Sequence, residues 1–202
     1  MRHVGYSSVE NFKNRLVRWW KYKAYGVDGL APLLQTYPPA LVIETLKKYG
    51  ASIGSGSILY SPLVIHNCSP EQGHHYSNLV IGKSCYIGRD VFLDLTCPIT
   101  FEDYTTISMR TTIITHTHDG NRVPSESVIA SSSGAVTIEH GAYIGTGATI
   151  LEGVTIGAKA IVGAGTVVIH SIPSGVVAVG VPARVVRKNS AFLNPFLSED
   201  RN

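Results

Sequence analysis

Aliphatic residues recur every six positions in the second half of the chain. The members of this series, separated mostly by small or polar residues, are Ile138, Ile144, Ile150, Ile156, Val162 and Val168. An α-helix of about 3.6 residues per turn would scatter such a period around its surface. Short strands joined by tight corners instead return the repeated position to the interior. The period therefore predicts a triangular β-coil with these side chains in its core.

The same period runs less regularly through the preceding part of the chain. Its earlier members are Ile81, Ile87, Leu93, Phe101, Ile107 and Ile113. The step from Leu93 to Phe101 is eight residues instead of six, and Pro98 lies inside it. This interruption predicts a bulge or a widened corner, and function tends to concentrate at such breaks.

Polar and apolar segments divide the chain into three parts. Residues 1–50 carry helical patterns and are expected to form a cap over the open end of the coil. Residues 51–170 contain the repeat, with polar excursions at about 67–78 and 115–135 that should be surface loops. Residues 171–202 should continue in extended form and end in a loose tail.

The first predicted helix carries an apolar stripe. Phe12, Leu16, Trp19 and Trp20 share one face, and basic residues occupy the rest of the surface. Packing of this stripe against the end of the solenoid is the favoured interpretation. The basic and aromatic composition of residues 11–23 also fits contact with a membrane surface, which we treat as the less favoured alternative.

The composition argues against several classes of function. The formal net charge is only +3, and basic residues cluster only near the N-terminus, so nucleic-acid binding is not expected. Three cysteines without a Cys-x-x-Cys pair indicate neither a disulfide framework nor a zinc knuckle, and they fit a reducing cytoplasm. No stretch approaches the roughly 20 apolar residues that span a bilayer, and no signal peptide is indicated. We therefore expect a cytoplasmic protein, soluble or at most peripheral.

Three features together resemble the hexapeptide-repeat acetyltransferases. They are the six-residue repeat, the histidine-containing loop between coils, and the closing segment 177–187, VAVGVPARVVR. The nearest branch looks like the maltose and galactoside O-acetyltransferases and the related polysaccharide- and xenobiotic-modifying enzymes. The resemblance covers about residues 80–188, whereas residues 1–50 do not look like the short helical cap of the sugar acetyltransferases.

This resemblance implies an all-β solenoid. The expected fold is a left-handed parallel β-helix of hexapeptide repeats with an N-terminal helical cap and an extended C-terminal tail. It also implies a homotrimer, an active site between neighbouring subunits, and acetyl-CoA as co-substrate with no metal. The expected reaction is transfer of the acetyl group to a hydroxyl of a sugar or glycan.

Acetyl transfer to a hydroxyl needs a base, and histidine is the natural base near neutral pH. The resemblance assigns this role to His116, which leaves the coil at the family's catalytic junction and is followed three positions later by Asp119. His118 is the alternative if the register moves by two residues. Asp94 lies at the irregular corner, where the family has Asn or Asp facing the acceptor. It would orient the acceptor hydroxyl or the imidazole, or else be a solvated corner carboxylate.

The carrier site also follows from the resemblance. The expected contacts are Gly145, Thr146, Ala164, His170, Arg184 and Arg187. The backbone N–H of Thr146 is a plausible oxyanion donor, and the small side chain of Ala164 leaves space for the pantetheine arm. Arg184 and Arg187 match cationic positions near the nucleotide phosphates. His170 stands where the family often has Lys.

Two alternatives stay open at this point. The first is N-acetylation of an amino sugar or nucleotide-sugar by the same base and carrier. The second is a non-catalytic or zinc-binding solenoid related to carbonic anhydrases, since two histidines can bind zinc. Only one residue separates His116 from His118, which does not match the spacing of those enzymes.

Overall fold

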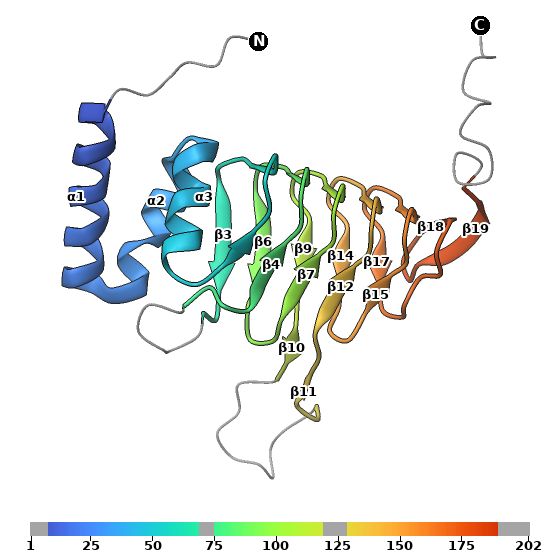
Figure 1. The fold of residues 1–202 in the computed structure, drawn as a ribbon. Coiled ribbons are helices and arrows are strands. Elements are labelled where there is room, and N and C mark those ends of the chain that lie inside the picture. The colour runs from blue at the N-terminus through green and yellow to red at the C-terminus, as the bar shows by residue number, and fades with distance from the viewer. Residues whose placement is uncertain (1–7, 69–74, 119–128, 190–202) are drawn as a thin grey trace, which may run out of the picture.

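The computed structural model describes residues 8–68, 75–118 and 129–189 of the 202-residue chain, with side chains described from residue 13 onward. Its central part is a coil whose sides are three sheets, stacked along one axis in Figure 1. Successive strands of the coil lie on different sides, and each pairs in parallel with its counterpart in the next coil. The predicted parallel β-helix is present.

The strands of the coil are mostly two residues long. The first sheet contains β1 (Ser52–Ile53), β4 (Leu79–Ile81), β7 (Ile99–Phe101), β12 (Val136–Ile138) and β15 (Thr155–Ile156). The second contains β2 (Ile58–Leu59), β5 (Tyr86–Ile87), β8 (Thr106–Ile107), β13 (Tyr143–Ile144), β16 (Ile161–Val162), β18 (Val176–Val179) and β19 (Arg184–Lys188). The third contains β3 (Leu63–His66), β6 (Val91–Asp94), β9 (Thr112–Ile113), β14 (Thr149–Ile150) and β17 (Val167–Val168).

The repeated aliphatic residues form the core. All six members of the regular series have no exposed surface. They stack in columns, since Ile144 lies opposite Ile107 in the coil before it and Val162 in the coil after it. Each column removes the surface of its stacked hydrophobic side chains from water, and this burial is the main stabilising contribution. The prediction drawn from the six-residue period is confirmed.

Adjacent coils approach too closely at some corners for a side chain. A Cβ atom added to Gly145 would lie 2.6 Å from the backbone nitrogen of Ala164 and 2.8 Å from the carbonyl oxygen of Val162. Those atoms belong to the next coil's backbone and cannot move aside cheaply. Glycine at this position is thus required by coil stacking, independently of any contact with a carrier.

The eight-residue step widens one corner of the coil. Strand β6 ends at Asp94, Leu95 stays buried, and β7 begins at Ile99. Backbone groups in the widened corner bond to other coils: Leu95 N–H donates to the carbonyl of His66 at 2.9 Å, and Cys97 N–H donates to Thr115 Oγ1 at 3.0 Å. The predicted irregularity is confirmed, and backbone N–H groups within it are hydrogen-bonded to neighbouring coils.

The two excursions leave the coil as expected. The second begins as β10 (His116–Thr117), paired antiparallel with β11 (Ser132–Ser133), and residues 119–128 lie outside the described part. The first contains residues 69–74, which are also outside it. Its end differs from a surface loop, because Tyr76 is only 1% exposed and its N–H donates to the carbonyl of Tyr49.

Helices cover the first coil, at the end opposite β18 and β19 in Figure 1. They are α1 (Ser8–Tyr25), the 3₁₀ turn η1 (Gly26–Gly29), α2 (Ala31–Thr36) and α3 (Pro39–Lys48). Helix α3 follows Pro38 and buries Leu41, Val42 and Leu46. Among the helices in the described residues, none is long and apolar enough to cross a membrane.

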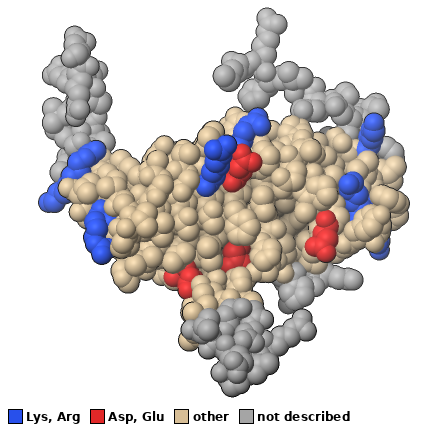
Figure 2. All heavy atoms as spheres, turned by 180° about the vertical axis from the view of Figure 1, so that it is seen from behind, with Lys and Arg blue, Asp and Glu red and all other residues tan. Residues whose placement is uncertain are grey.

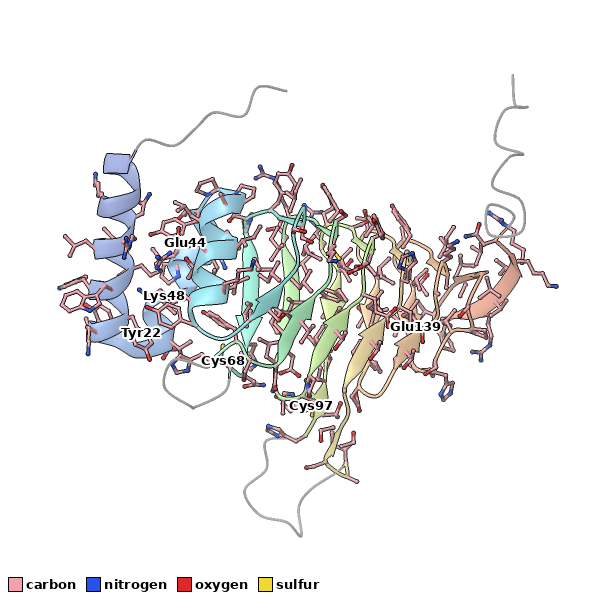
Figure 3. All side chains as sticks on the ribbon, viewed as in Figure 1. Tyr22, Glu44, Lys48, Cys68, Cys97 and Glu139 are labelled. Atoms are coloured by element: carbon pink, nitrogen blue, oxygen red, sulfur yellow. The ribbon has the colours of Figure 1, made fainter. Side chains whose placement is uncertain are left out.

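The predicted packing of the α1 stripe is wrong. Leu16, Trp19 and Trp20 are 54%, 51% and 56% exposed, so the apolar face points away from the solenoid. The inward face instead holds Arg18, which is 1% exposed and donates hydrogen bonds to Glu44 and Thr45 of α3. Figure 3 labels Glu44 on the side of α3 that faces α1. An ion pair and its hydrogen bonds, not the apolar stripe, determine which face of α1 is inside.

The C-terminal extension closes the other end of the coil. Strand β18 continues the second sheet parallel to β16, and β19 folds back antiparallel to β18. Residues 176–179 and 184–188 are extended, with a turn at 180–183 between them, and the part of the expected tail from residue 190 onward lies outside the described residues. On the face seen in Figure 2, Lys and Arg side chains are scattered and form no continuous basic tract over the described surface.

Candidate functional site

One corner of the coil gathers polar groups from three successive coils. Strands β3, β6 and β9 are neighbours in the third sheet, with His66 opposite Asp94 and Leu93 opposite Ile113. Because parallel strands end at the same edge, the residues just after each strand meet there. These are Asn67, the widened corner at Asp94, and the segment that carries His116.

The carboxylate of Asp94 is almost fully buried and faces His116. Its Oδ2 lies 2.6 Å from His116 Nδ1, and the Asp94 residue is 2% exposed. The same oxygen accepts the N–H of Thr115 at 2.9 Å. Oδ1 accepts the Thr96 hydroxyl at 2.9 Å and the Asn67 amide at 3.0 Å. The expectation of a solvated corner carboxylate is thus wrong.

These hydrogen bonds decide the charge of Asp94. Burial alone would raise its pKa, but hydrogen bonds from His116, Thr115, Thr96 and Asn67 outweigh that effect and hold the pKa well below the usual range. An ionised carboxylate can only accept, so Nδ1 of His116 carries the proton in this bond. In a neutral His116, the nitrogen with a lone pair free to accept a proton is therefore Nε2.

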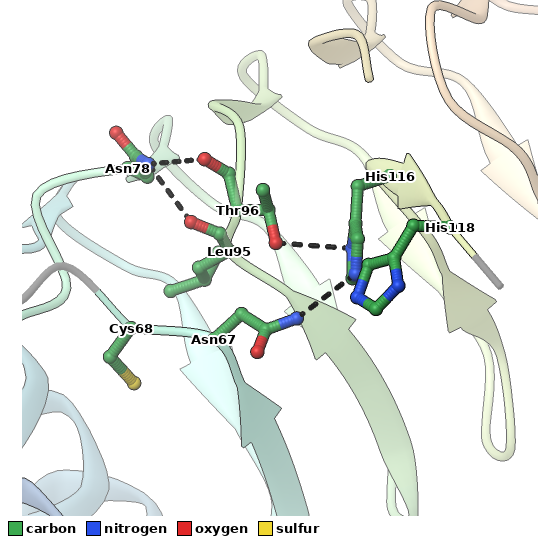
Figure 4. A pocket seen from close by; sticks show the side chains of 7 residues that line it. All are labelled: Asn67, Cys68, Asn78, Leu95, Thr96, His116 and His118. Carbon is green, nitrogen blue, oxygen red and sulfur yellow. Dashed lines mark hydrogen bonds between the residues drawn. The ribbon is translucent and has the colours of Figure 1, made fainter. Parts of the chain in front are cut away.

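Nε2 of His116 faces a cavity of about 500 Å³. The residues that line it, drawn in Figure 4, are Asn67, Cys68, Asn78, Leu95, Thr96, His116 and His118. The amide nitrogen of Asn67 lies 3.5 Å from Nε2, and the amide of Asn78 donates to the carbonyl of Leu95 at 2.9 Å. The site combines an oriented imidazole with amide and hydroxyl groups, which suits a hydroxyl-rich ligand.

The geometry distinguishes the two candidate histidines. The rings of His116 and His118 have centroids 5.4 Å apart, and both line the cavity. The buried carboxylate of Asp94 contacts the imidazole of His116, and this contact orients the ring. Asp119 lies outside the described residues.

The predicted carrier residues lie at other corners. Gly145 and Thr146 follow β13, and Ala164 follows β16, so these three lie where the second sheet turns into the third. They are stacked, since Gly165 N–H donates to the carbonyl of Thr146 at 2.9 Å. Arg184 and Arg187 are on β19, and His170 is an exposed residue after β17. His116 follows the third sheet instead, so one chain does not bring these residues to its imidazole.

Sequence reasoning missed the groups that support the His–Asp pair. Asn67 and Thr96 both bond to Asp94, yet each lies in a segment without a recognisable motif. A usable signal exists in the stacking: polar residues lie at the ends of β3, β6 and β9 or within three positions after them, and these strands are neighbours in one sheet. In the described part of the chain, no three His, Cys, Asp or Glu side chains are grouped so that they could hold a metal ion.

Comparison with known proteins agrees with this architecture. Residues 135–170 match the family model described as bacterial transferase hexapeptide (six repeats). A solved hexapeptide-repeat-containing acetyltransferase from Vibrio cholerae is similar with a TM-score of 0.68 and 23% identity, over 88% of this chain and 93% of that one. A galactoside acetyltransferase solved in complex with coenzyme A has a TM-score of 0.68 and 23% identity, over 89% of this chain and 84% of that one.

A curated relative matches a shorter region. The serine acetyltransferase of Bacillus licheniformis is 35% identical over 115 residues, covering 57% of this chain and 42% of that protein. The chain thus spans less than half the length of this relative.

The family match shows hexapeptide repeats at residues 135–170, and the repeat together with the similar structures implies a left-handed coil. The resemblance to hexapeptide-repeat acetyltransferases, with a galactoside acetyltransferase among the similar structures, is confirmed.

Proposed function

We propose that this protein is an acetyl-CoA-dependent acetyltransferase that acts on a hydroxyl of a sugar or glycan. The observation that carries the proposal is the buried Asp94 carboxylate holding Nδ1 of His116 at 2.6 Å, so that Nε2 is directed into the cavity. Similarity to acetyltransferases, one solved with coenzyme A, supports the choice of acyl donor.

His116 acts as a general base and then as a general acid. Its Nε2 accepts the proton of the acceptor hydroxyl while the hydroxyl oxygen attacks the thioester carbonyl. Collapse of the tetrahedral intermediate breaks the carbon–sulfur bond, and the imidazolium returns the proton to the leaving sulfur. The products are the acetyl ester and free CoA thiol. Asp94 stabilises the imidazolium between the two proton transfers without being protonated itself.

Asn67 and Thr96 keep the pair in place. Both donate to Oδ1 of Asp94, while Oδ2 accepts from the imidazole and from Thr115. The amide of Asn67 also lies 3.5 Å from Nε2, close to the position that an acceptor hydroxyl must occupy. The backbone N–H of Thr146 is the proposed donor to the thioester oxyanion, from a neighbouring subunit.

This function is tested by supplying acetyl-CoA together with a panel of sugars, amino sugars, nucleotide-sugars and glycans. The turnover is measured as the release of CoA thiol. We expect ester formation with a hydroxyl acceptor. Exclusive amide formation would replace the hydroxyl assignment by N-acetylation. Stoichiometric zinc without binding of CoA would contradict the transferase assignment and favour the metal-binding alternative.

We further propose that the site is shared between subunits of a homotrimer. His116 follows the third sheet, whereas Thr146 and Ala164 lie at the corner between the second and third sheets. A neighbouring subunit related by rotation can bring its own corner next to His116, which one chain cannot do by itself.

Complementation between two inactive variants tests the shared site. We expect low activity from H116A and, at low acetyl-CoA concentration, from the double variant Arg184→Ala, Arg187→Ala. Trimers refolded from an equal mixture should recover about one quarter of wild-type activity, because each site takes its base and its arginines from different subunits. Absence of recovery in mixed trimers that are shown to form would contradict sharing of the site.

A further inference from the structure

The outward face of α1 is apolar and uncovered. Leu16, Trp19 and Trp20 are each more than half exposed, and Tyr25 is 64% exposed with its ring 6.2 Å from that of Trp20. In Figure 1, α1 stands at the far end of the solenoid, and no described element packs against its outer side. Large apolar side chains concentrated on one helix face usually mark a surface that binds something.

This face cannot turn inward without loss of specific contacts. Arg18, on the opposite face, is 1% exposed and paired with Glu44 and Thr45. Tyr22, on the same inward side, hydrogen-bonds His75 at 3.0 Å and packs its ring 4.7 Å from that of Tyr49. Rotation of α1 to bury the tryptophans would expose these groups and leave Glu44 without its cation. The outward position of the tryptophans is therefore built into the cap.

The charges around the apolar face all have one sign. Lys13, Arg15 and Lys23 are exposed. On a helical projection Arg15 and Lys13 flank the strip formed by Leu16, Trp19 and Trp20, and Lys23 lies at its C-terminal end. From residue 13 to residue 25 the chain contains no Asp or Glu. A surface complementary to this face must have an apolar layer that the indole rings can enter and negative charge close to the basic side chains.

We propose that the outer face of α1 docks on the surface of an anionic lipid bilayer. Tryptophan and tyrosine prefer the level of the lipid headgroups, and basic residues at their sides gain from anionic lipid. A helix with this arrangement lies in the plane of the interface. The α1 helix of a second copy fits less well, because direct contact between two such helices would bring their exposed cations together. This proposal reverses the preference for packing on the solenoid drawn from the sequence.

Docking through α1 leaves the candidate active site accessible. The helix caps the end of the coil, whereas β10 and β11, which begin and end the excursion beside the cavity, leave the coil near its middle (Figure 1). Contact with a bilayer at the capped end would leave the cavity open to solvent.

Co-sedimentation of the full-length protein with vesicles tests the proposal. We expect binding to vesicles of phosphatidylcholine mixed with phosphatidylglycerol, and little binding to phosphatidylcholine alone. The double variant Trp19→Ser, Trp20→Ser should bind at least about tenfold more weakly. The triple variant Lys13→Gln, Arg15→Gln, Lys23→Gln should lose on the order of a hundredfold at low salt.

A control variant distinguishes binding through this face from nonspecific binding by exposed aromatic side chains. Tyr104→Ser removes an aromatic side chain that is 59% exposed on the solenoid, and it should bind anionic vesicles as the wild type does. The proposal is overturned if the wild type does not bind anionic vesicles at low salt, or if both α1 variants still bind them. It is also overturned if the tryptophan variant changes the oligomer size in light scattering while no form binds vesicles, which would make the face an interface between copies.

Discussion

Replacing His116 with alanine is expected to lower kcat by roughly 10²- to 10⁴-fold, the usual contribution of a positioned general base. The reason is geometric: Nδ1 is held by the buried carboxylate of Asp94 at 2.6 Å, and Nε2 faces the cavity. The side chain of His116 is 23% exposed and forms no part of the core, so thermal unfolding should change little. Rates of CoA thiol release, binding of CoA and the melting temperature are the measurements.

The matched control is the same substitution two residues later. His118→Ala removes an imidazole from the same cavity but leaves the contact between Asp94 and His116 in place. We expect this variant to keep most of the activity. If His118→Ala abolishes turnover and His116→Ala does not, the base is His118 and the assignment to His116 is wrong.

Asp94→Asn is expected to lower kcat by about 10²- to 10⁴-fold while the KM for acetyl-CoA changes little. An amide has nearly the same shape, but it cannot stabilise an imidazolium, and its NH₂ group can force the wrong tautomer on His116. Asp94 also accepts from Thr115 and Thr96, so an amide leaves some of these donors with a poorer partner. Thr96→Val, which removes the hydroxyl contacts with Oδ1 of Asp94 and with Nδ1 of His116, should cost less than about tenfold because the contact between Asp94 and His116 remains.

The pH dependence of the free energy of unfolding provides a second, independent test of the ionised state of Asp94. Its pKa in the folded protein is lowered from the ordinary value of 3.8, so the folded state holds the ionised form more firmly than the unfolded state does. The resulting stabilisation is complete above the unfolded pKa and is lost as the pH falls below about 4. Urea unfolding of wild type should therefore weaken from pH 5 to pH 3 more steeply than that of Asp94→Asn. Equal slopes would mean that Asp94 does not ionise as described.

The local pattern of the chain was enough to predict the coil. Aliphatic residues at every sixth position have one arrangement that buries them all, and Ile138 through Val168 are all without exposed surface. The same regularity made its own interruption visible, so the order of the amino acids was enough to locate the widened corner after Leu93. His116 could be selected because the resemblance placed the family's base directly after the coil.

The partners of these residues could not be predicted in the same way. Asp94 and His116 are 22 positions apart, and their pairing depends on the register of β6 against β9. Asn67 joins them from a third coil, 27 positions before Asp94, with no local motif. Contacts between coils depend on how many residues each corner contains, and a single extra residue changes which side chains meet.

The cap shows the limit of periodicity most clearly. The apolar stripe of α1 predicts a buried face, as it would for a helix on an ordinary core. In the folded protein α1 presents its opposite face to the rest of the cap. Arg18 on that face donates to Glu44 and Thr45 of α3. Tyr22 packs on Tyr49 and hydrogen-bonds His75. The sequence by itself determined the coil, its break and the place of the histidine. Only tertiary structure decided the carboxylate that orients this histidine and the face that α1 presents to solvent, since both depend on hydrogen bonds between segments far apart in the chain.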